Sequence, residues 1–170
     1  MSTTNTQRRF NLTRQYMNIR LSYEAKLCIE KIQNEVQDKM NNSISTNELD
    51  EIESIIKKYL SDKNPIFSSV SITNILKVST SSIIEEACYF TWNYTSKDWF
   101  RIDEEMRKYN FKMNIDVGSL TPKLYLENEV IDRLQQYQKD FMKESMVRVV
   151  KMSYVIKVVV FAYYLHLFNN

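Results

Sequence analysis

Apolar and polar positions alternate along two short stretches of the chain. Over residues 15–22, Met17, Ile19 and Leu21 fall on one side and polar side chains on the other. Residues 120–126 read the same way. A period of two predicts a β-strand with one buried face. Each predicted strand is followed by apolar residues at helical spacing. The chain therefore contains two segments in which a strand is followed by a helix.

Helical patterns cover most of the remaining chain. Ser22 stands at the N-cap position of the first helix, which is predicted to run to about Met40, and Ser79 stands at the N-cap of a later one. A helix that begins near Thr46 is expected to end before Pro65, ahead of a short apolar piece at 70–76. Further helices are predicted over 94–113, from Glu127 onward, and over 153–168. One glycine and two prolines in 170 residues favour long helices with few tight turns.

The two strand-helix segments align with each other at an offset of 105 residues. The coinciding apolar pairs are Ile19 with Leu124, Leu21 with Leu126, Ala25 with Val130, Ile29 with Leu134, and Ile32 with Tyr137, and Gln33 falls on Gln138. The helices that close the two segments match at an offset of 75, which sets Ile83, Ile84 and Ala87 on Val158, Val159 and Ala162. Chance alignment of amphipathic helices is the alternative. The repeat is favoured because a strand and two helices recur in the same order.

One such unit cannot form a stable domain, because a lone strand leaves its backbone groups unpaired and two helices bury too little. Two units can pair their strands and pack four helices beneath them about a pseudo-twofold axis. We therefore predict a mainly α fold with one two-stranded antiparallel ribbon. The expected parts are a flexible basic arm at 1–13, a first copy at 14–94 with an insertion at 45–76, a connecting helix at 95–118 and a second copy at 119–168.

This arrangement resembles the ribbon-helix-helix superfamily of DNA-binding proteins, the group of the Arc and methionine repressors. The resemblance covers 14–40, 77–94 and 119–168. Its strongest local match is Lys77–Ala87, which looks like the start of the family's second helix, and the stretch Met17–Glu24 looks like its strand and first helix cap. Most members are dimers of short chains. The tandem copy, the inserted helix and residues 94–118 depart from that pattern.

The resemblance implies that the ribbon lies in the DNA major groove with its outward side chains against base edges. The expected base-contacting residues are Tyr16, Asn18 and Arg20 on the first strand and Thr121, Lys123 and Tyr125 on the second. Arginine can pair bidentately with guanine, and asparagine with adenine. Because the two sets differ, an asymmetric DNA site is expected. The alternative is a solvated strand face.

Phosphate contacts are expected at the starts of the closing helices, where free backbone amides and the helix dipole favour anions. The candidates are Lys77, Ser79, Thr80 and Ser81 in the first copy, and Lys151 and Ser153 in the second. Plain helix capping is the alternative for the hydroxyl residues. Arg8, Arg9 and Arg14 are candidate arm contacts to the DNA backbone or minor groove, with a solvated tail as the alternative.

The charge distribution agrees with a polyanionic partner although the net charge is only +2. Residues 1–22 hold four arginines and no acid, and residues 139–157 hold five basic residues against two acids. Acids gather instead at 48–53 and 103–105. Such segregation predicts one basic face on a nearly neutral protein.

Residues suited to metal or nucleophilic chemistry are few. His166 is the single histidine, and Cys28 and Cys88 lack metal-ligand spacing. We expect no enzyme activity, no metal and no cofactor. Both cysteines fall in apolar helical patterns and are expected to be buried free thiols, as in a cytoplasmic protein. The apolar run 152–168 is expected to be a core helix and not a membrane span, because it is short and contains Lys157.

The leading hypothesis is sequence-specific binding of double-stranded DNA by a plasmid or mobile-element protein. Single-chain tandem proteins of this kind occur among accessory factors of conjugation, so we place a relaxosome accessory role near a transfer origin first, with a relaxase or another transfer protein as partner. A transcriptional repressor or a plasmid partition or copy-control protein is the alternative. A helical interaction scaffold without DNA binding is the rival of another class. The chain would act as a monomeric pseudo-dimer, with several copies on repeated sites, and the inserted helices would pack on the core or recruit a partner.

Overall fold

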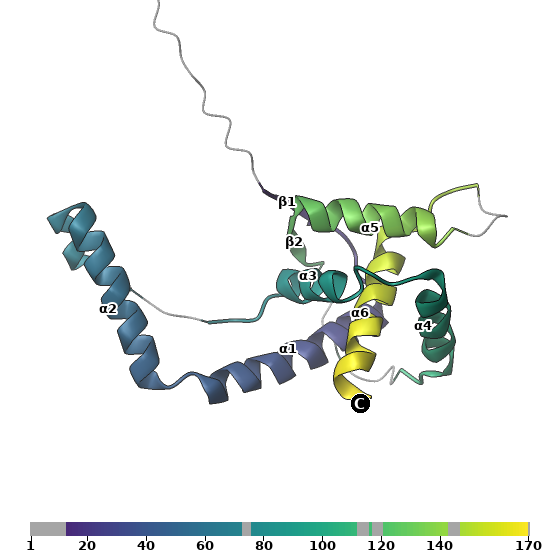
Figure 1. The fold of residues 1–170 in the computed structure, drawn as a ribbon, viewed down its shortest axis with the longest axis horizontal. Coiled ribbons are helices and arrows are strands. Elements are labelled where there is room, and N and C mark those ends of the chain that lie inside the picture. Colours follow the sequence, from purple (N-terminus) through teal and green to yellow (C-terminus); the bar gives the residue numbers. More distant parts are fainter. Residues whose placement is uncertain (1–12, 73–75, 112–115, 117–120, 143–146, 170) are drawn as a thin grey trace, which may run out of the picture.

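The computed structural model describes residues 13–72, 76–111, 116, 121–142 and 147–169. Within these ranges, six α-helices accompany one two-stranded antiparallel sheet (Figure 1). The strands are β1 (Arg14–Asn18) and β2 (Lys123–Glu127). The helices are α1 (Tyr23–Ser43), α2 (Thr46–Lys63), α3 (Thr80–Phe90), α4 (Ser96–Lys108), α5 (Asn128–Asp140) and α6 (Met152–Phe168), with a short 3-10 helix η1 (Pro65–Ser69). The predicted mainly helical fold with one antiparallel strand pair is confirmed.

Both strands are shorter than predicted, and Pro122 explains where their ladder stops. The register pairs Met17 with Leu124 and Asn18 with Lys123. One step further, Ile19 would face Pro122. Hydrogen-bonded and non-hydrogen-bonded pairs alternate in an antiparallel ladder, and the Ile19–Pro122 position falls on a hydrogen-bonded pair. Proline has no N–H to donate there, so the ladder ends one pair earlier.

The predicted helix starts at Ser22 and Ser79 are confirmed by capping bonds. Ser22 Oγ accepts from the Ala25 N–H at 3.2 Å, and Ser79 Oγ accepts from the Ser82 N–H at 3.0 Å. The other limits shift by a few residues. Helix α1 continues to Ser43, α4 is shorter than the predicted 94–113, and Glu127 ends β2 and caps α5 without a capping side-chain bond.

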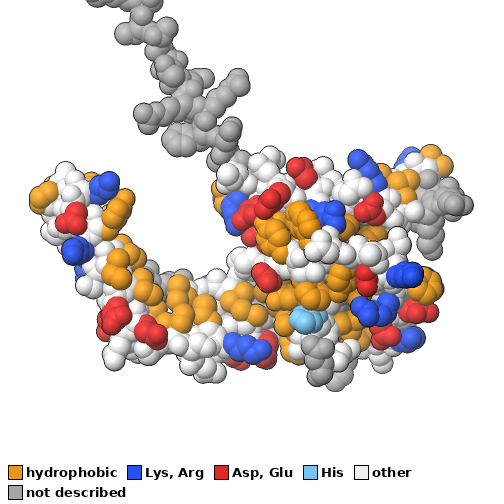
Figure 2. Space-filling model, viewed as in Figure 1, with side chains coloured by type: hydrophobic (Ala, Val, Ile, Leu, Met, Phe, Trp, Pro, Cys, Tyr) orange, Lys and Arg blue, Asp and Glu red, His pale blue; other side chains and the backbone are white. Residues whose placement is uncertain are grey.

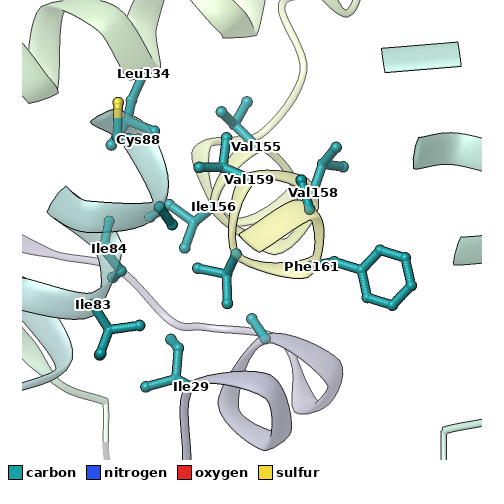
Figure 3. Close-up of a cluster of buried hydrophobic side chains, with 14 of the residues drawn as sticks. Ile29, Ile83, Ile84, Cys88, Leu134, Val155, Ile156, Val158, Val159 and Phe161 are labelled. Atoms are coloured by element: carbon teal, nitrogen blue, oxygen red, sulfur yellow. The ribbon is translucent and has the colours of Figure 1, made fainter. Parts of the chain in front are cut away.

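Helix α6 forms the centre of the core. It packs against α1, α3, α4 and α5. A helix that is apolar on every side is stable only where other helices cover it, and eight residues of α6 are buried. Figure 3 shows Ile156 and Val159 of α6 facing Ile84 and Cys88 of α3, with Leu134 of α5 nearby. The core assignment of 152–168 is therefore confirmed, and among the described residues no helix has the length and apolarity to cross a membrane.

Cys28 and Cys88 are both buried and free, as expected. Burial raises the pKa of each thiol to about 12. The thiols are therefore neutral near pH 7, so they behave as small apolar core groups.

The predicted insertion at 45–76 contains α2 and η1, and these two helices lie away from the core (Figure 1). No residue of α2 is buried. Figure 1 shows α1 extending from the helical body and α2 rising steeply from its outer end, and we call the bend formed by these two helices the hook.

Candidate nucleic-acid interface

One face of the two-stranded sheet is exposed, and we call it the ribbon face. The register places Tyr16 opposite Tyr125 and Asn18 opposite Lys123, and all four side chains are exposed. Behind them, Leu124 is fully buried beneath the sheet. The predicted outward set on the strands therefore does face away from the core, whereas its contact with bases stays a prediction.

A row of rings and cations runs along the ribbon face. The ring centroids of Tyr16 and Tyr125 are 4.5 Å apart. Lys123 Nζ lies 4.3 Å from the Tyr16 centroid, and the Arg14 guanidinium carbon lies 6.0 Å from that of Tyr125. Tyr16 and Tyr125 form a non-hydrogen-bonded pair, in which opposing side chains come closest. The row holds these side chains in place, which reduces the entropy lost when a partner binds.

Arg14 is anchored by two carboxylates and is not part of a terminal arm. Its Nη1 donates to Glu85 Oε1 at 2.9 Å, and its Nη2 donates to Glu127 Oε1 at 2.6 Å. Burial alone would lower the pKa of Arg14, but the charges of Glu85 and Glu127 outweigh it and the pKa is raised. Arg14 therefore lies in β1 and not in an arm, whereas its contact with DNA stays a prediction.

Glu127 also accepts a bond from Tyr89, whose hydroxyl lies 2.6 Å from Oε2. This bond is the main cause that holds the pKa of Glu127 below its ordinary value, and Arg14 adds to it against the opposing effect of burial. Glu127 is therefore ionised near neutral pH, where it keeps Arg14 and Tyr89 together at this end of the ribbon.

Helix α3 covers the outer edge of β2 with two side chains one turn apart. Ser81 Oγ accepts from the Tyr125 N–H, and Glu85 Oε1 accepts from the Glu127 N–H, both at 2.9 Å. Four residues of a helix and two residues of a strand each advance about 6 Å, so the two donors and the two acceptors are matched in spacing. Sequence reasoning missed Glu85. A carboxylate set among Ile83, Ile84 and Ala87 was the available signal.

The start of α3 lies beside the ribbon. Ser79 and Ser82 form a reciprocal capping box, and Lys77 is exposed just before it. Thr80 is half-buried. Ser81, predicted as a phosphate contact, uses its oxygen to hold β2. The phosphate contacts predicted for Lys77, Ser79, Thr80 and Ser81 stay predictions.

The start of α6 borders a basic cleft of about 550 Å³. Lys151 occupies the N-cap position without a capping side-chain bond, and Ser153 also lines the cleft. Arg148 and Lys157 contribute two more cations, and Ser22 closes the side next to α1. A helix N-terminus among three basic side chains suits an anionic group. Arg148 and Lys157 were not predicted as contacts, although the basic run at 139–157 contains both.

The remaining predicted residues lie beside the ribbon or outside the described ranges. Arg20 and Thr121 are exposed just beyond the strand ends, and the register continued past Lys123 would place them opposite each other. Arg8 and Arg9 lie outside the described residues, as does the rest of the predicted arm except its last residue.

The two copies of the sequence repeat share a side-chain hydrogen bond. Gln33 Nε2 on α1 donates to the Val78 carbonyl at 3.2 Å. Gln138 Nε2 on α5 donates to the Val150 carbonyl at 2.7 Å. Val78 and Val150 each stand one residue before the N-cap of the following helix. Two glutamines that the offset of 105 aligns thus each bond to the carbonyl just before a helix N-cap.

Comparison of the chain with protein-family models, with curated proteins and with solved structures finds no match. The functional assignment below therefore rests on the geometry of the ribbon face and its flanking helix starts.

Proposed function

We propose that this protein binds double-stranded DNA in a sequence-specific manner, as a tandem ribbon-helix-helix protein that inserts its ribbon face into the major groove. The observation that carries the proposal is the position of Asn18 and Lys123. They are directly paired and are also equivalent by the repeat offset of 105 residues. A pseudo-twofold axis that relates two copies passes through such a pair and no other in the ladder.

Two further features support the same axis. Helices α1 and α5 begin at Tyr23 and Asn128, again 105 residues apart. The equivalent bonds of Gln33 and Gln138 tie each of these helices to the start of the helix that closes its copy. The order strand, helix, closing helix occurs twice along the chain, which supports the proposal of two ribbon-helix-helix units.

The chemistry of the ribbon face supports base readout. Asn18 can accept from and donate to adenine, and Lys123 can donate to guanine, whereas Tyr16 and Tyr125 offer apolar rings to thymine methyl groups. The start of α3 next to β2 and the basic cleft at the start of α6 supply backbone amides and cations for phosphates. Both kinds of contact are needed, because phosphate contacts set register and base contacts set sequence.

The two ends of the ribbon face carry different side chains, so the proposed DNA site is asymmetric. One end presents Tyr16 and Tyr125, the middle presents Asn18 and Lys123, and the far end presents Arg20 with Thr121. We expect the strongest base preference under the middle and the Arg20 end, where arginine, lysine and asparagine make directional hydrogen bonds.

The experiment is a selection from a random duplex pool with the full-length protein, followed by titration of the selected site. Asn18→Ala and Lys123→Ala should each lower affinity for that site by about 1–3 kcal/mol and relax the preference at one or two base pairs. Lys97→Ala, an exposed lysine on α4, is the matched control and should leave affinity unchanged. Enrichment of no sequence, or equal affinity in all four proteins, would contradict the proposal.

The biological role we place first is that of a relaxosome accessory protein near a plasmid transfer origin, with a relaxase as partner. A transcriptional repressor or a partition or copy-control protein uses the same ribbon and is the second candidate. Footprinting across the non-coding DNA next to the gene separates them. Protection beside a nick site supports the first role, and protection over a promoter or a partition site supports the second.

A further inference from the structure

Helix α2 and the adjoining η1, at the outer part of the hook, lack a packing partner other than each other among the described residues. The substantial contacts of α2 are with η1 alone. Most of the stability of a helix in a protein comes from packing of its apolar face, and a capping box such as that of Ser45 and Glu48 adds only a part. The helix therefore gains stability if its apolar side is covered.

That apolar side is extensive. Fifteen large apolar side chains are exposed in the described residues, and five of them lie on α2 and η1: Ile52, Ile55, Tyr59, Ile66 and Phe67. Val70 and Leu76 follow in the same segment. Figure 2 shows hydrophobic side chains along α2 and α1, bordering the open side of the hook. A concentration of this kind marks an interaction surface, because single exposed apolar residues are usually scattered.

The charges of α2 are divided between its two ends. Its first half carries Glu48, Asp50, Glu51 and Glu53. Its second half carries Lys57, Lys58 and Lys63, with Asp62 as the single acid there. A helix with an acidic first half and a basic second half is complementary to itself in the antiparallel direction. In that direction the dipoles of the two helices also point in opposite directions, which is their favourable arrangement.

We infer that α2 is a dimerisation helix, which pairs antiparallel with α2 of a second copy of this chain about a twofold axis. Ile55 lies near the centre of the contact. Glu51 and Lys58 lie on the same side of α2 as Ile55, four residues before it and three after it, so each faces the other residue in the second copy. The contact is isologous and closes on itself, which yields a dimer and not a filament.

The first test measures the mass of the full-length protein in solution, without DNA, by light scattering and sedimentation over a range of concentrations. The wild-type protein should be a dimer that dissociates on dilution. Ile55→Asp should weaken dimerisation roughly tenfold or more, as expected for a charge placed at the centre of an apolar contact. Tyr59→Asp tests the same surface with a second side chain. Because α2 buries no residue in the single chain, both variants should keep the helix content of the dissociated wild-type protein.

Phe100→Asp on α4 is the matched control. Phe100 is 66% exposed and Ile55 is 67% exposed, so the two substitutions remove comparable apolar surface from different places. The control should dimerise as the wild type does. A wild-type monomer up to on the order of 100 μM, or equal weakening by both substitutions, would overturn the inference.

A second test addresses the antiparallel direction. Glu51→Lys and Lys58→Glu should each weaken the dimer, and the two changes combined in one chain should restore it. In a parallel pair each residue would face its counterpart in the second copy, so each change would replace one like-charge pair by another and neither single change would weaken the dimer. The inference stands apart from the proposed DNA binding, because it is measured without DNA. Asn18→Ala and Lys123→Ala should leave the dimer unchanged.

Discussion

Gln33 and Gln138 make the same hydrogen bond at two places in the chain. Each amide group donates to the carbonyl of the residue that precedes a helix N-cap, Val78 in one case and Val150 in the other. The two glutamines lie 105 residues apart, which is also the offset between the two strand-helix segments. A shared polar contact is stronger support for a repeat than shared apolar positions, because any two amphipathic helices have the latter.

These two bonds should contribute similarly to stability. Gln33→Ala and Gln138→Ala should each lower the free energy of unfolding by about 0.5–1.5 kcal/mol, since each leaves a carbonyl without its side-chain donor. Urea unfolding followed by circular dichroism measures this. Gln136→Ala is the control on α5, because Gln136 is exposed and bonds only locally to Asp140. A loss in one copy alone would argue against equivalent roles.

Glu85 should be the most sensitive polar residue beside the ribbon. Its buried carboxylate accepts from Arg14 and from the Glu127 N–H. Glu85→Ala leaves the Glu127 N–H without its acceptor and removes one of the two carboxylates of Arg14, and we expect it to lower the free energy of unfolding by about 1–3 kcal/mol. Glu85→Gln keeps an acceptor oxygen and should cost less. If both variants lower the denaturant midpoint equally, the charge of Glu85 stabilises the fold and its hydrogen bond to the Glu127 N–H does not.

Stability should fall at acidic pH partly through Glu127. The hydrogen bond from Tyr89, aided by the charge of Arg14, lowers the folded-state pKa of Glu127 below its ordinary value of 4.5. The stabilisation is therefore complete above that ordinary value and is lost as pH falls through the lower folded pKa. Glu127→Gln removes this dependence, so its midpoint of urea unfolding should change less than that of the wild type between roughly pH 3 and pH 7.

Glu24, Glu48 and Asp98 also have lowered pKa values. They are present in both proteins, so the difference between the two curves isolates Glu127. Tyr89→Phe supplies a second comparison and should also flatten the acid limb. If the urea midpoints of the wild type and both variants changed equally with pH, the hydrogen bonds of Glu127 would not contribute to the pH dependence of stability.

Much of the architecture could be predicted because local rules and core packing agree. Alternation at 15–22 and capping serines at Ser22 and Ser79 indicated real elements, and the apolar run 152–168 is the central helix. The strand ends could not be predicted from alternation. They depend on which residue faces Pro122 across the ladder, and that is fixed only when the two strands pair.

The candidate site divides in the same way. Outward positions on a strand follow from its period of two, so the exposure of Tyr16, Asn18, Lys123 and Tyr125 was predictable. The role of Arg14 was not predictable, because its partner Glu85 lies 71 residues away in the sequence. The use of Ser81 to hold β2 was missed for the same reason, because a serine near a helix start gives no local sign of a strand beside it.

Photo-crosslinking from the ribbon face tests the central claim most directly. A photoreactive phenylalanine analogue placed at Asn18 or at Lys123 of the full-length protein would be irradiated on the selected duplex, with Phe100 substituted in the same way as the control. We expect crosslinks from 18 and 123 to bases near the middle of the site, and none from 100. Crosslinks from 100 with none from the ribbon would show that DNA lies on another face, and the account would then be wrong.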